Sequence, residues 1–158
     1  MGPLVSQKQL NTVLGFIEKG KEEGARLVAG GNRALQKGFF VQPTIFADVQ
    51  DTMTIAQEEI FGPVMSILSF ETIEEVIVRA NNSKYGLAAS IWTENVKKAH
   101  YIASKLQAGT VWINDFGLEW ETMPFGGYKQ SGIGREMGGE YGLSNYTEVK
   151  SVFVNMKQ

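Results

Sequence analysis

The chain has 158 residues, 43% of them hydrophobic and 20% charged, and its formal net charge is −2. This length suits one domain with a sizeable core, while the balanced charge and short apolar stretches argue against nucleic acid or a membrane as partner. The sequence contains no cysteine, so it supplies no disulfide, thiolate ligand or cysteine nucleophile, and with no secretory signal predicted we expect the cytoplasm.

The first predicted element is an amphipathic helix that begins after Ser6 and ends near Gly24. Ser6 and Gln9 have the spacing of a capping box, and apolar residues recur at helical intervals at Leu10, Val13, Leu14 and Ile17. A short strand over 26–29 follows. Pro43 then interrupts the apolar residues of 39–46, which favours an edge strand or an extended loop there.

From position 63 onward, strands and helices alternate. The apolar run 64–70 is typical of a strand covered on both faces, and Thr72 with Glu75 forms a second capping pair. Asn95 is suited to cap a further helix. Strands are predicted over 87–92 and 110–114, and the helix between them would end at Gly109 after burying Val96, Ala99, Ile102, Ala103 and Leu106. This order predicts an α/β layer.

The regular pattern stops after Asn114 and resumes at Tyr146. Seven glycines lie between Gly126 and Gly142, which indicates either a surface loop or backbone that approaches a ligand or another subunit closely. The residues of 149–154 then predict a last strand with apolar groups on both faces. Such a strand at a chain terminus has an unpaired edge that invites a partner.

Few residues have the pattern of a catalytic or metal site. His100, the only histidine, lies beside lysines on the polar side of a predicted helix, which favours a solvated role. No group of histidines and carboxylates has metal-ligand spacing. Gly132-Ile133-Gly134 lacks the third glycine of a dinucleotide loop, because Met137 stands at that position.

The turn Glu58-Glu59-Ile60-Phe61-Gly62-Pro63 is the most informative candidate. Gly62 and Pro63 predict a tight, fixed turn at the entrance of a buried strand, where α/β proteins bind ligands. A carboxylate such as Glu59 accepts hydrogen bonds from two ribose hydroxyls, and an aromatic ring such as Phe61 covers a flat heterocycle. The alternative is an exposed turn with a packed phenylalanine.

Two segments, QEEIFGPV at 57–64 and PFGGYKQSGIGRE at 124–136, resemble aldehyde dehydrogenase. Further similar segments lie at 2–6, 38–44, 85–88, 109–114 and 146–150, so the resemblance covers essentially the whole chain. It is to the C-terminal part of that family, and betaine aldehyde dehydrogenases are the most similar. The resemblance implies an α/β fold with part of the catalytic domain at 1–145 and an oligomerisation strand at 146–158. One departure is an apparent extra residue at Gly138-Gly139.

The resemblance implies the oxidation of an aldehyde to its acid with NAD or NADP as the cofactor. In that family a cysteine thiolate attacks the aldehyde and a glutamate activates water. Both groups, and the Rossmann domain, belong to family segments that precede those matched here. We therefore expect no catalytic residue in this chain and no aldehyde oxidation by the chain alone.

The resemblance also assigns roles to individual residues. Glu59 is similar to the glutamate that binds the nicotinamide ribose, and Phe61 to the ring beside the nicotinamide. Substrate-pocket positions are matched by Asn114, Trp120 and Phe125, the last at a site that helps to form an aromatic box for trimethylammonium in betaine aldehyde users.

A second set of residues is matched to supporting roles. Bracing of the active site and the dimer interface is implied for Arg135, Glu136 and Glu148. The backbone carbonyls of Lys129 and Gly132 are similar to ligands of a monovalent cation, K⁺, between subunits.

Three hypotheses for the isolated chain follow from these matches. It is half of a split enzyme that a separate N-terminal half completes, or a non-catalytic module that pairs with other aldehyde dehydrogenase subunits through its last strand. The third is a degenerate fragment that exposes surfaces meant for the missing domain. The first two predict an oligomer, and none involves nucleic acid or a membrane.

Overall fold

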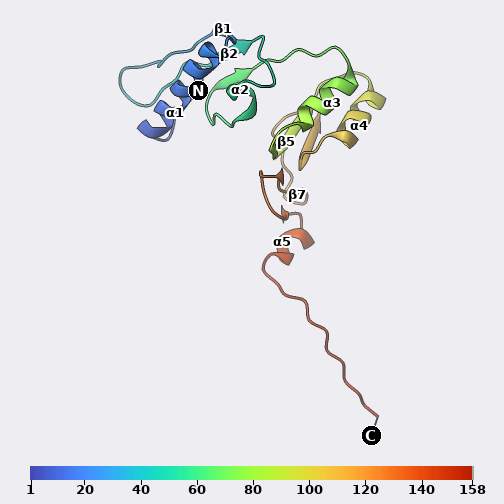
Figure 1. Ribbon diagram of the computed structural model, residues 1–158. Helices are drawn as coiled ribbons and strands as arrows, with labels where there is room; N and C mark the ends of the chain where they lie inside the picture. The colour runs from blue at the N-terminus through green and yellow to red at the C-terminus, as the bar shows by residue number, and fades with distance from the viewer. Residues whose placement is uncertain (158) are drawn as a thin grey trace. The chain divides into compact units, whose positions relative to one another are not determined.

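The computed structural model describes residues 1–157, which form two compact units that divide between Arg79 and Ala80. The first unit holds α1 (Gln7–Glu22), β1 (Arg26–Ala29), β2 (Thr44–Ala47), α2 (Thr54–Gln57) and β3 (Val64–Ser66) (Figure 1). Its sheet has the order β1-β2-β3, with β1 and β2 antiparallel and β2 and β3 parallel. The helix and the first strand thus lie where the sequence predicts them.

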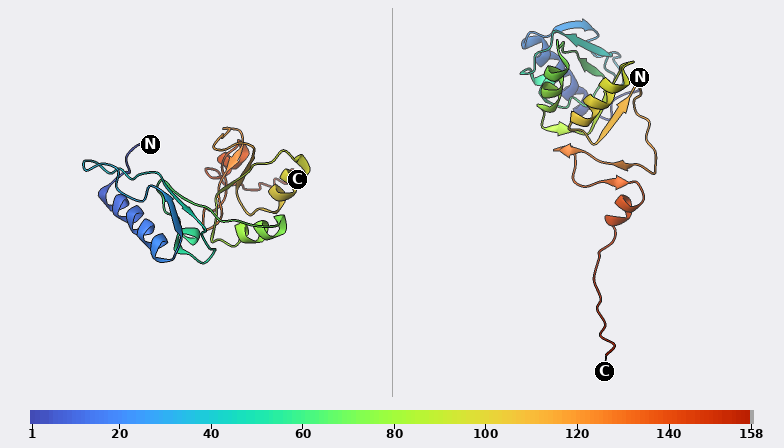
Figure 2. Two further views of the ribbon diagram at one scale, coloured as in Figure 1. Left: turned by 90° about the horizontal axis from the view of Figure 1, so that it is seen from above. Right: turned by 90° about the vertical axis from the view of Figure 1, so that its right-hand side faces the viewer.

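The core of the first unit forms between α1 and the sheet. Leu10, Val13 and Ile17 of α1 are at most 1% exposed and belong to one cluster with Phe46 of β2 and Ile55 of α2. Figure 2 shows α1 running beside the strands of this unit. Full burial of side chains of this size stabilises a fold by about 1.5–3 kcal/mol each. This core fixes the rigid base from which the turn after α2 projects.

Of the two alternatives predicted around Pro43, the extended loop agrees with residues 39–43, which belong to no strand element, whereas the edge strand is wrong, because β2 is the central strand of the sheet. Pro43 stands one residue before β2, so its missing N–H removes no bond from the ladder. The strand predicted over 64–70 is also shorter and less covered than expected. It ends at Ser66, and Met65 within it is 57% exposed, so only one face is covered by this chain.

In the second unit, α/β alternation is confirmed over the first half. It contains β4 (Tyr85–Gly86), β5 (Ala88–Ile91), α4 (Val96–Lys105) and β6 (Thr110–Ile113). The strands β5 and β6 pair in parallel from Ala88 opposite Thr110 to Ile91 opposite Ile113. The connection through α4 is therefore the strand-helix-strand unit that the sequence predicts.

The helix caps agree with the sequence, while the inner face of α4 differs. Helix α3 (Ile73–Asn81) starts from a reciprocal pair, since the Glu75 N–H donates to Thr72 and the Glu75 carboxylate accepts from the Thr72 N–H. The Asn95 side chain accepts from the Lys98 N–H. Of the predicted inner face only Ala99 is buried, and Val96 is 65% exposed. The helix ends at Lys105, earlier than Gly109.

The glycine-rich region contains short elements that the sequence does not reveal. These are β7 (Pro124–Phe125), β8 (Tyr128–Lys129), β9 (Glu136–Met137) and α5 (Glu140–Ser144). The strand β8 pairs with β4, and β9 pairs with β7. Beyond α5, the described residues 147–157 join no sheet, so the last strand predicted over 149–154 does not form within this chain. Among residues 1–157, no helix is both long and apolar enough to cross a membrane.

Candidate functional site

The turn between α2 and β3 presents two of the predicted site residues to solvent. Glu59 is exposed and the Phe61 side chain is 75% exposed, whereas Ile60 between them is buried in the core at 9% exposure. Ile60 thus anchors the turn and leaves a carboxylate and an aromatic ring outside. These groups suit a ribose with two hydroxyls and a flat heterocycle, so the residues present fit the nicotinamide end of a dinucleotide.

The backbone of this turn is unusual at Phe61. Its φ is +53°, in the left-handed region that costs a residue with a side chain about 1–2 kcal/mol. The next residue lies against α1, where a Cβ on Gly62 would come within 2.6 Å of a Val13 methyl carbon. Tight packing therefore requires glycine at 62 and holds the chain against the helix.

Gln9, which the sequence suggests only as a helix-capping residue, holds the same turn. Gln9 of α1 donates its side-chain amide to the carbonyl of Phe61 at 2.9 Å and to that of Ile60 at 3.4 Å. The capping-box spacing predicts that this side chain turns back toward Ser6, so the available signal points elsewhere. Only the Ser6 half of the box forms, with the Ser6 hydroxyl accepting from the Gln9 N–H at 3.2 Å.

The start of α2 is fixed by a distant carboxylate. Met53 precedes the helix and caps no N–H with its side chain, and Glu23 instead accepts from the N–H and the hydroxyl of Thr54, both at 2.6 Å. The hydrogen bond from the Thr54 hydroxyl, followed by the one from its N–H, lowers the pKa of Glu23 below the ordinary value. This pair secures the short helix that leads into the turn.

The predicted pocket residues of the second unit differ in what their side chains do. Asn114 has φ +55° and uses its whole amide on one residue, accepting from the Thr93 N–H at 2.8 Å and donating to the Thr93 carbonyl at 2.9 Å. Trp120 is 62% exposed and Phe125 is half-buried in β7. The Asn114 side chain therefore binds the backbone of Thr93 in this chain, while the two aromatic rings are at least partly exposed.

The residues assigned to bracing are linked to Phe125 through the backbone. Glu136 lies opposite Phe125 in the β7–β9 ladder. The Arg135 guanidinium donates to the carbonyls of Gly127 and Gly134 and lies over the Tyr128 ring, 5.1 Å from its centroid. Glu148 is exposed and makes no hydrogen bond or ion pair within residues 1–157. Arg135 and Glu136 thus lie beside β7 and the residues that follow it, where Phe125 stands. Within the described residues, Glu148 has no contact of this kind.

The candidate cation ligands lie at the end of β8, where Lys129 is its last residue, and in the loop that follows, which contains Gly132. Lys129 has φ +54°, and its ammonium donates to the carbonyls of Asn81 at 2.6 Å and Ser83 at 2.9 Å. Its own carbonyl and that of Gly132 are two oxygens, whereas oxygen-bound hard cations take about six or more. The fit to K⁺ is therefore partial in this chain. No cluster of histidine or acidic residues in the described part of the chain could hold a metal ion.

Comparison with known proteins adds the family. The model of the aldehyde dehydrogenase family matches residues 1–152. The chain belongs to the aldehyde dehydrogenase family. It is 61% identical over 157 residues to the mitochondrial aldehyde dehydrogenase of Equus caballus, a match that covers 99% of this chain and 31% of that protein. The structure of an aldehyde dehydrogenase from Bacillus cereus in complex with NAD⁺ is 66% identical, with a TM-score of 0.96, over 99% of this chain and 32% of that one.

The family relatives include betaine aldehyde dehydrogenases, and the resemblance found in the sequence is confirmed. That of Cereibacter sphaeroides is 55% identical over 156 residues, covering 99% of this chain and 32% of the relative. The identity to the mitochondrial enzyme is higher, so similarity does not single out betaine aldehyde as the substrate. The chain spans about a third of the length of the aldehyde dehydrogenases that it matches.

Proposed function

We propose that this chain forms the nicotinamide-ribose end of the cofactor site and one wall of the aldehyde pocket in an NAD(P)⁺-dependent aldehyde dehydrogenase. The observation that carries the proposal is the turn at 58–63, in which a buried Ile60 leaves the Glu59 carboxylate and the Phe61 ring outside. The family match supports it, since a relative from Bacillus cereus has been solved as an NAD⁺ complex.

Within that enzyme, the residues of this chain bind and orient. Glu59 accepts hydrogen bonds from the ribose hydroxyls, and Phe61 covers one face of the nicotinamide. Phe125 and Trp120 line the aldehyde pocket, and Asn114 holds the loop that leads to them. The cofactor, when bound, accepts the hydride that leaves the aldehyde carbon. Arg135, Glu136 and Glu148 brace the pocket and a subunit interface, and the carbonyls of Lys129 and Gly132 contribute to a K⁺ site.

The nucleophile must come from outside these residues, because the 158 residues contain no cysteine. We expect the chain alone to oxidise no aldehyde. Either a separate N-terminal half or another aldehyde dehydrogenase subunit completes the site, in an oligomer of the cytoplasm. Among aldehydes, betaine aldehyde is favoured by Phe125 and Trp120, since aromatic rings attract a trimethylammonium group.

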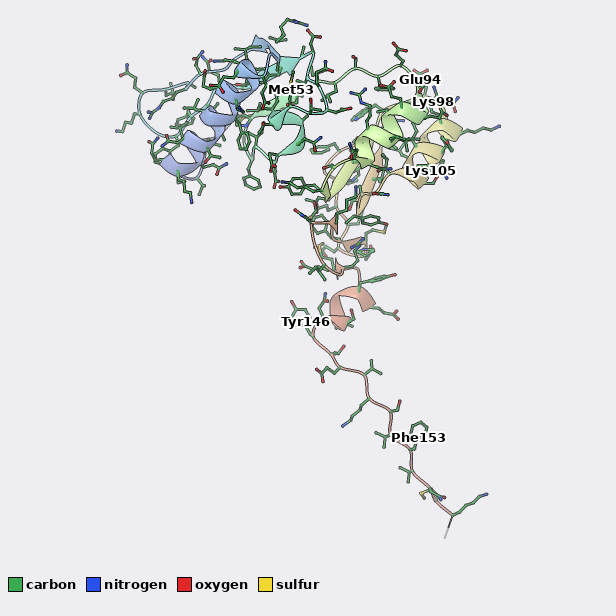
Figure 3. The ribbon with its side chains drawn as sticks, in the orientation of Figure 1. Met53, Glu94, Lys98, Lys105, Tyr146 and Phe153 are labelled. Atoms are coloured by element: carbon green, nitrogen blue, oxygen red, sulfur yellow. The ribbon has the colours of Figure 1, made fainter. Side chains whose placement is uncertain are left out.

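A second candidate is a non-catalytic module that pairs with full-length aldehyde dehydrogenase subunits. Residues 147–157 favour it, because Val149 and Phe153 are 100% and 93% exposed and the segment joins no sheet in the described chain. Figure 3 shows the labelled side chain of Phe153 on this segment. We call residues 147–157 the tail.

The deciding experiment is size-exclusion chromatography with light scattering, on the chain alone and mixed with an N-terminal aldehyde dehydrogenase half or a full-length subunit. NADH formation is assayed in every fraction. Activity above that of either component, found only in the mixed complex, supports the enzyme, whereas a stable complex without added activity supports the module. Activity in the chain alone would contradict both.

A substitution tests the role of the turn in the mixed complex. Glu59→Gln is expected to raise the KM for the cofactor roughly 10- to 100-fold, because hydrogen bonds to a charged group are lost. Glu74→Gln, at an exposed carboxylate in the first turn of α3, is the matched control and should leave KM unchanged. An unchanged KM in Glu59→Gln would remove the proposed ribose contact.

A further inference from the structure

The Gln9 side chain departs from its expected place. Ser6 accepts from the Gln9 N–H at 3.2 Å, as in a capping box, but the Gln9 amide crosses to the turn at 58–63, which is 51–52 residues away in sequence. A capping box would satisfy a helix N–H with that side chain. In this chain the amide is used to hold the backbone of the turn.

The hydrogen bond from Gln9 is made at the residue of the turn whose backbone conformation is least favourable. Phe61 is the residue in the left-handed region, at φ +53°, and its carbonyl is the closer acceptor, at 2.9 Å. A residue with a side chain stays in that region only where its surroundings determine the conformation. A donor on the Phe61 carbonyl fixes the peptide plane after Phe61 and keeps the ring on the outer side of the turn.

The donor itself stands on a rigid support. Leu10 and Val13, which follow Gln9 on α1, are 1% and 0% exposed, and Val13 lies so near Gly62 that a Cβ there would come within 2.6 Å of it. The Gln9 amide therefore reaches the turn from a helix whose inner face is locked in the core. The Gln9 side chain thus fixes Glu59 and Phe61, the residues on either side of Ile60, relative to α1.

We propose that Gln9 is a positioning residue for the cofactor: it holds the turn at 58–63 so that the Glu59 carboxylate and the Phe61 ring face outward together. It acts through the turn and is assigned no contact with the reacting atoms. The inference rests on the proposed function for what the turn binds, whereas the state of the turn itself is measurable without any ligand.

The test uses the whole chain and three variants. Gln9→Glu keeps the shape of the side chain but removes the amide donor, and Gln9→Ala removes the side chain. Gln7→Ala is the matched control, because Gln7 is a glutamine in the same first turn of α1, is exposed where Gln9 is half-buried, and bonds through its side chain to Asn11, at 2.8 Å, and not to the turn. Circular dichroism checks that each variant keeps its helices.

Nuclear magnetic resonance on the labelled chain gives the first readout. In both Gln9 variants we expect a changed three-bond HN–Hα coupling at Phe61 and amide exchange about tenfold faster at Phe61 and Gly62. Gln7→Ala should match the wild type. An unchanged coupling and exchange rate in Gln9→Glu would overturn the inference, whatever the chain binds.

Titration with nicotinamide mononucleotide gives the second readout. We expect wild-type shifts confined to residues 59–62 and an apparent Kd about tenfold weaker in Gln9→Glu. No wild-type shift at 59–62 would overturn the proposed cofactor contact and with it the cofactor role of Gln9. Wild-type binding with equal affinity in Gln9→Glu would overturn the positioning role alone.

Discussion

The carboxylate of Glu23 accepts two hydrogen bonds from Thr54, one from its N–H and one from its hydroxyl, each at 2.6 Å. Glu23 follows α1 and Thr54 opens α2, so a side chain 31 residues away caps a helix that its own N-terminal neighbour leaves uncapped. Because α2 ends directly before the turn at 58–63, this pair joins the core helix to the candidate cofactor site.

The first prediction concerns the pH dependence of this pair. The pKa of Glu23 is lowered in the folded chain, chiefly by the hydrogen bond from the Thr54 hydroxyl. Its stabilisation is therefore complete above the ordinary glutamate pKa of about 4.3 and is lost as the pH falls from there through the lowered value. We expect Glu23→Gln to have a lower melting temperature than the wild type at pH 7. The difference in melting temperature between the two proteins should shrink as the pH falls toward 3.

Thermal unfolding of both proteins between pH 3 and pH 7 checks this prediction. Glu22→Gln is the control, because Glu22 ends the same helix with a 69% exposed side chain in a long surface ion pair of 3.7 Å with Lys19. It should change the melting temperature little at any pH. A difference for Glu23→Gln that grows on acidification would contradict the assignment.

The second prediction separates the two properties of Asn114. Asn114→Gly keeps a residue suited to φ +55° and loses the two bonds to Thr93, at a cost of about 1–2 kcal/mol. Asn114→Ala also strains the backbone and should cost about 1 kcal/mol more. Denaturant unfolding of the two variants measures the difference, and equal stability would show that the left-handed conformation is not maintained.

The third prediction concerns the close approach of the backbone at Gly109 to the backbone at Gly126, the residue after Phe125. A Cβ on Gly109 would overlap the carbonyl oxygen of Gly126, which directly follows Phe125. We expect Gly109→Ala to destabilise the chain by about 1–3 kcal/mol, since backbone must move. Gly15→Ala, in open space on the exposed face of α1, should instead stabilise by about 0.5–1 kcal/mol. Denaturant unfolding measures both, and a neutral Gly109→Ala would refute the overlap.

The fourth prediction tests the tail as an interface. Val152 is 73% exposed and belongs to no ladder within residues 1–157, so Val152→Asp should leave the melting temperature of the monomer unchanged. In light scattering it should abolish association, because a charge is placed in the predicted inter-subunit strand. Val152→Thr keeps a β-branched side chain and should retain association. Loss of association in both variants equally would argue against strand pairing.

Local sequence signals predict the three longer helices of this chain, α1, α3 and α4, but neither of the short helices α2 and α5. Ser6, Thr72 and Asn95 each cap the helix that they precede, because a cap is a contact over three residues that needs no tertiary structure. The parallel pair β5–β6 follows from the same alternation of strand and helix. Similarity of short segments adds the family, which composition and periodicity alone do not reveal.

The sequence predicts less well where a residue's role depends on distant partners. Pro43 suggests an edge, yet β1 and β3, drawn from 15 or more residues away, place β2 in the centre. Gln9 suggests a cap, yet its partner is Phe61. The burial expected for Val96 fails because nothing in the described chain covers that side of α4. In each case the missing information is the position of another segment.

The second unit is closed by contacts between residues that are far apart in sequence. Lys129 bonds to the Ser83 carbonyl 46 residues away, and the Gly86 N–H donates to Ser131 across 45, about twice the separation of the β5–β6 partners. Closing the longer loop costs more chain entropy, so we expect the strand-helix-strand unit of β5, α4 and β6 to form first. The two long-range contacts of Lys129 and Ser131, which we call the clasp, then form last. Weakening the clasp should therefore accelerate unfolding and leave the folding rate nearly unchanged.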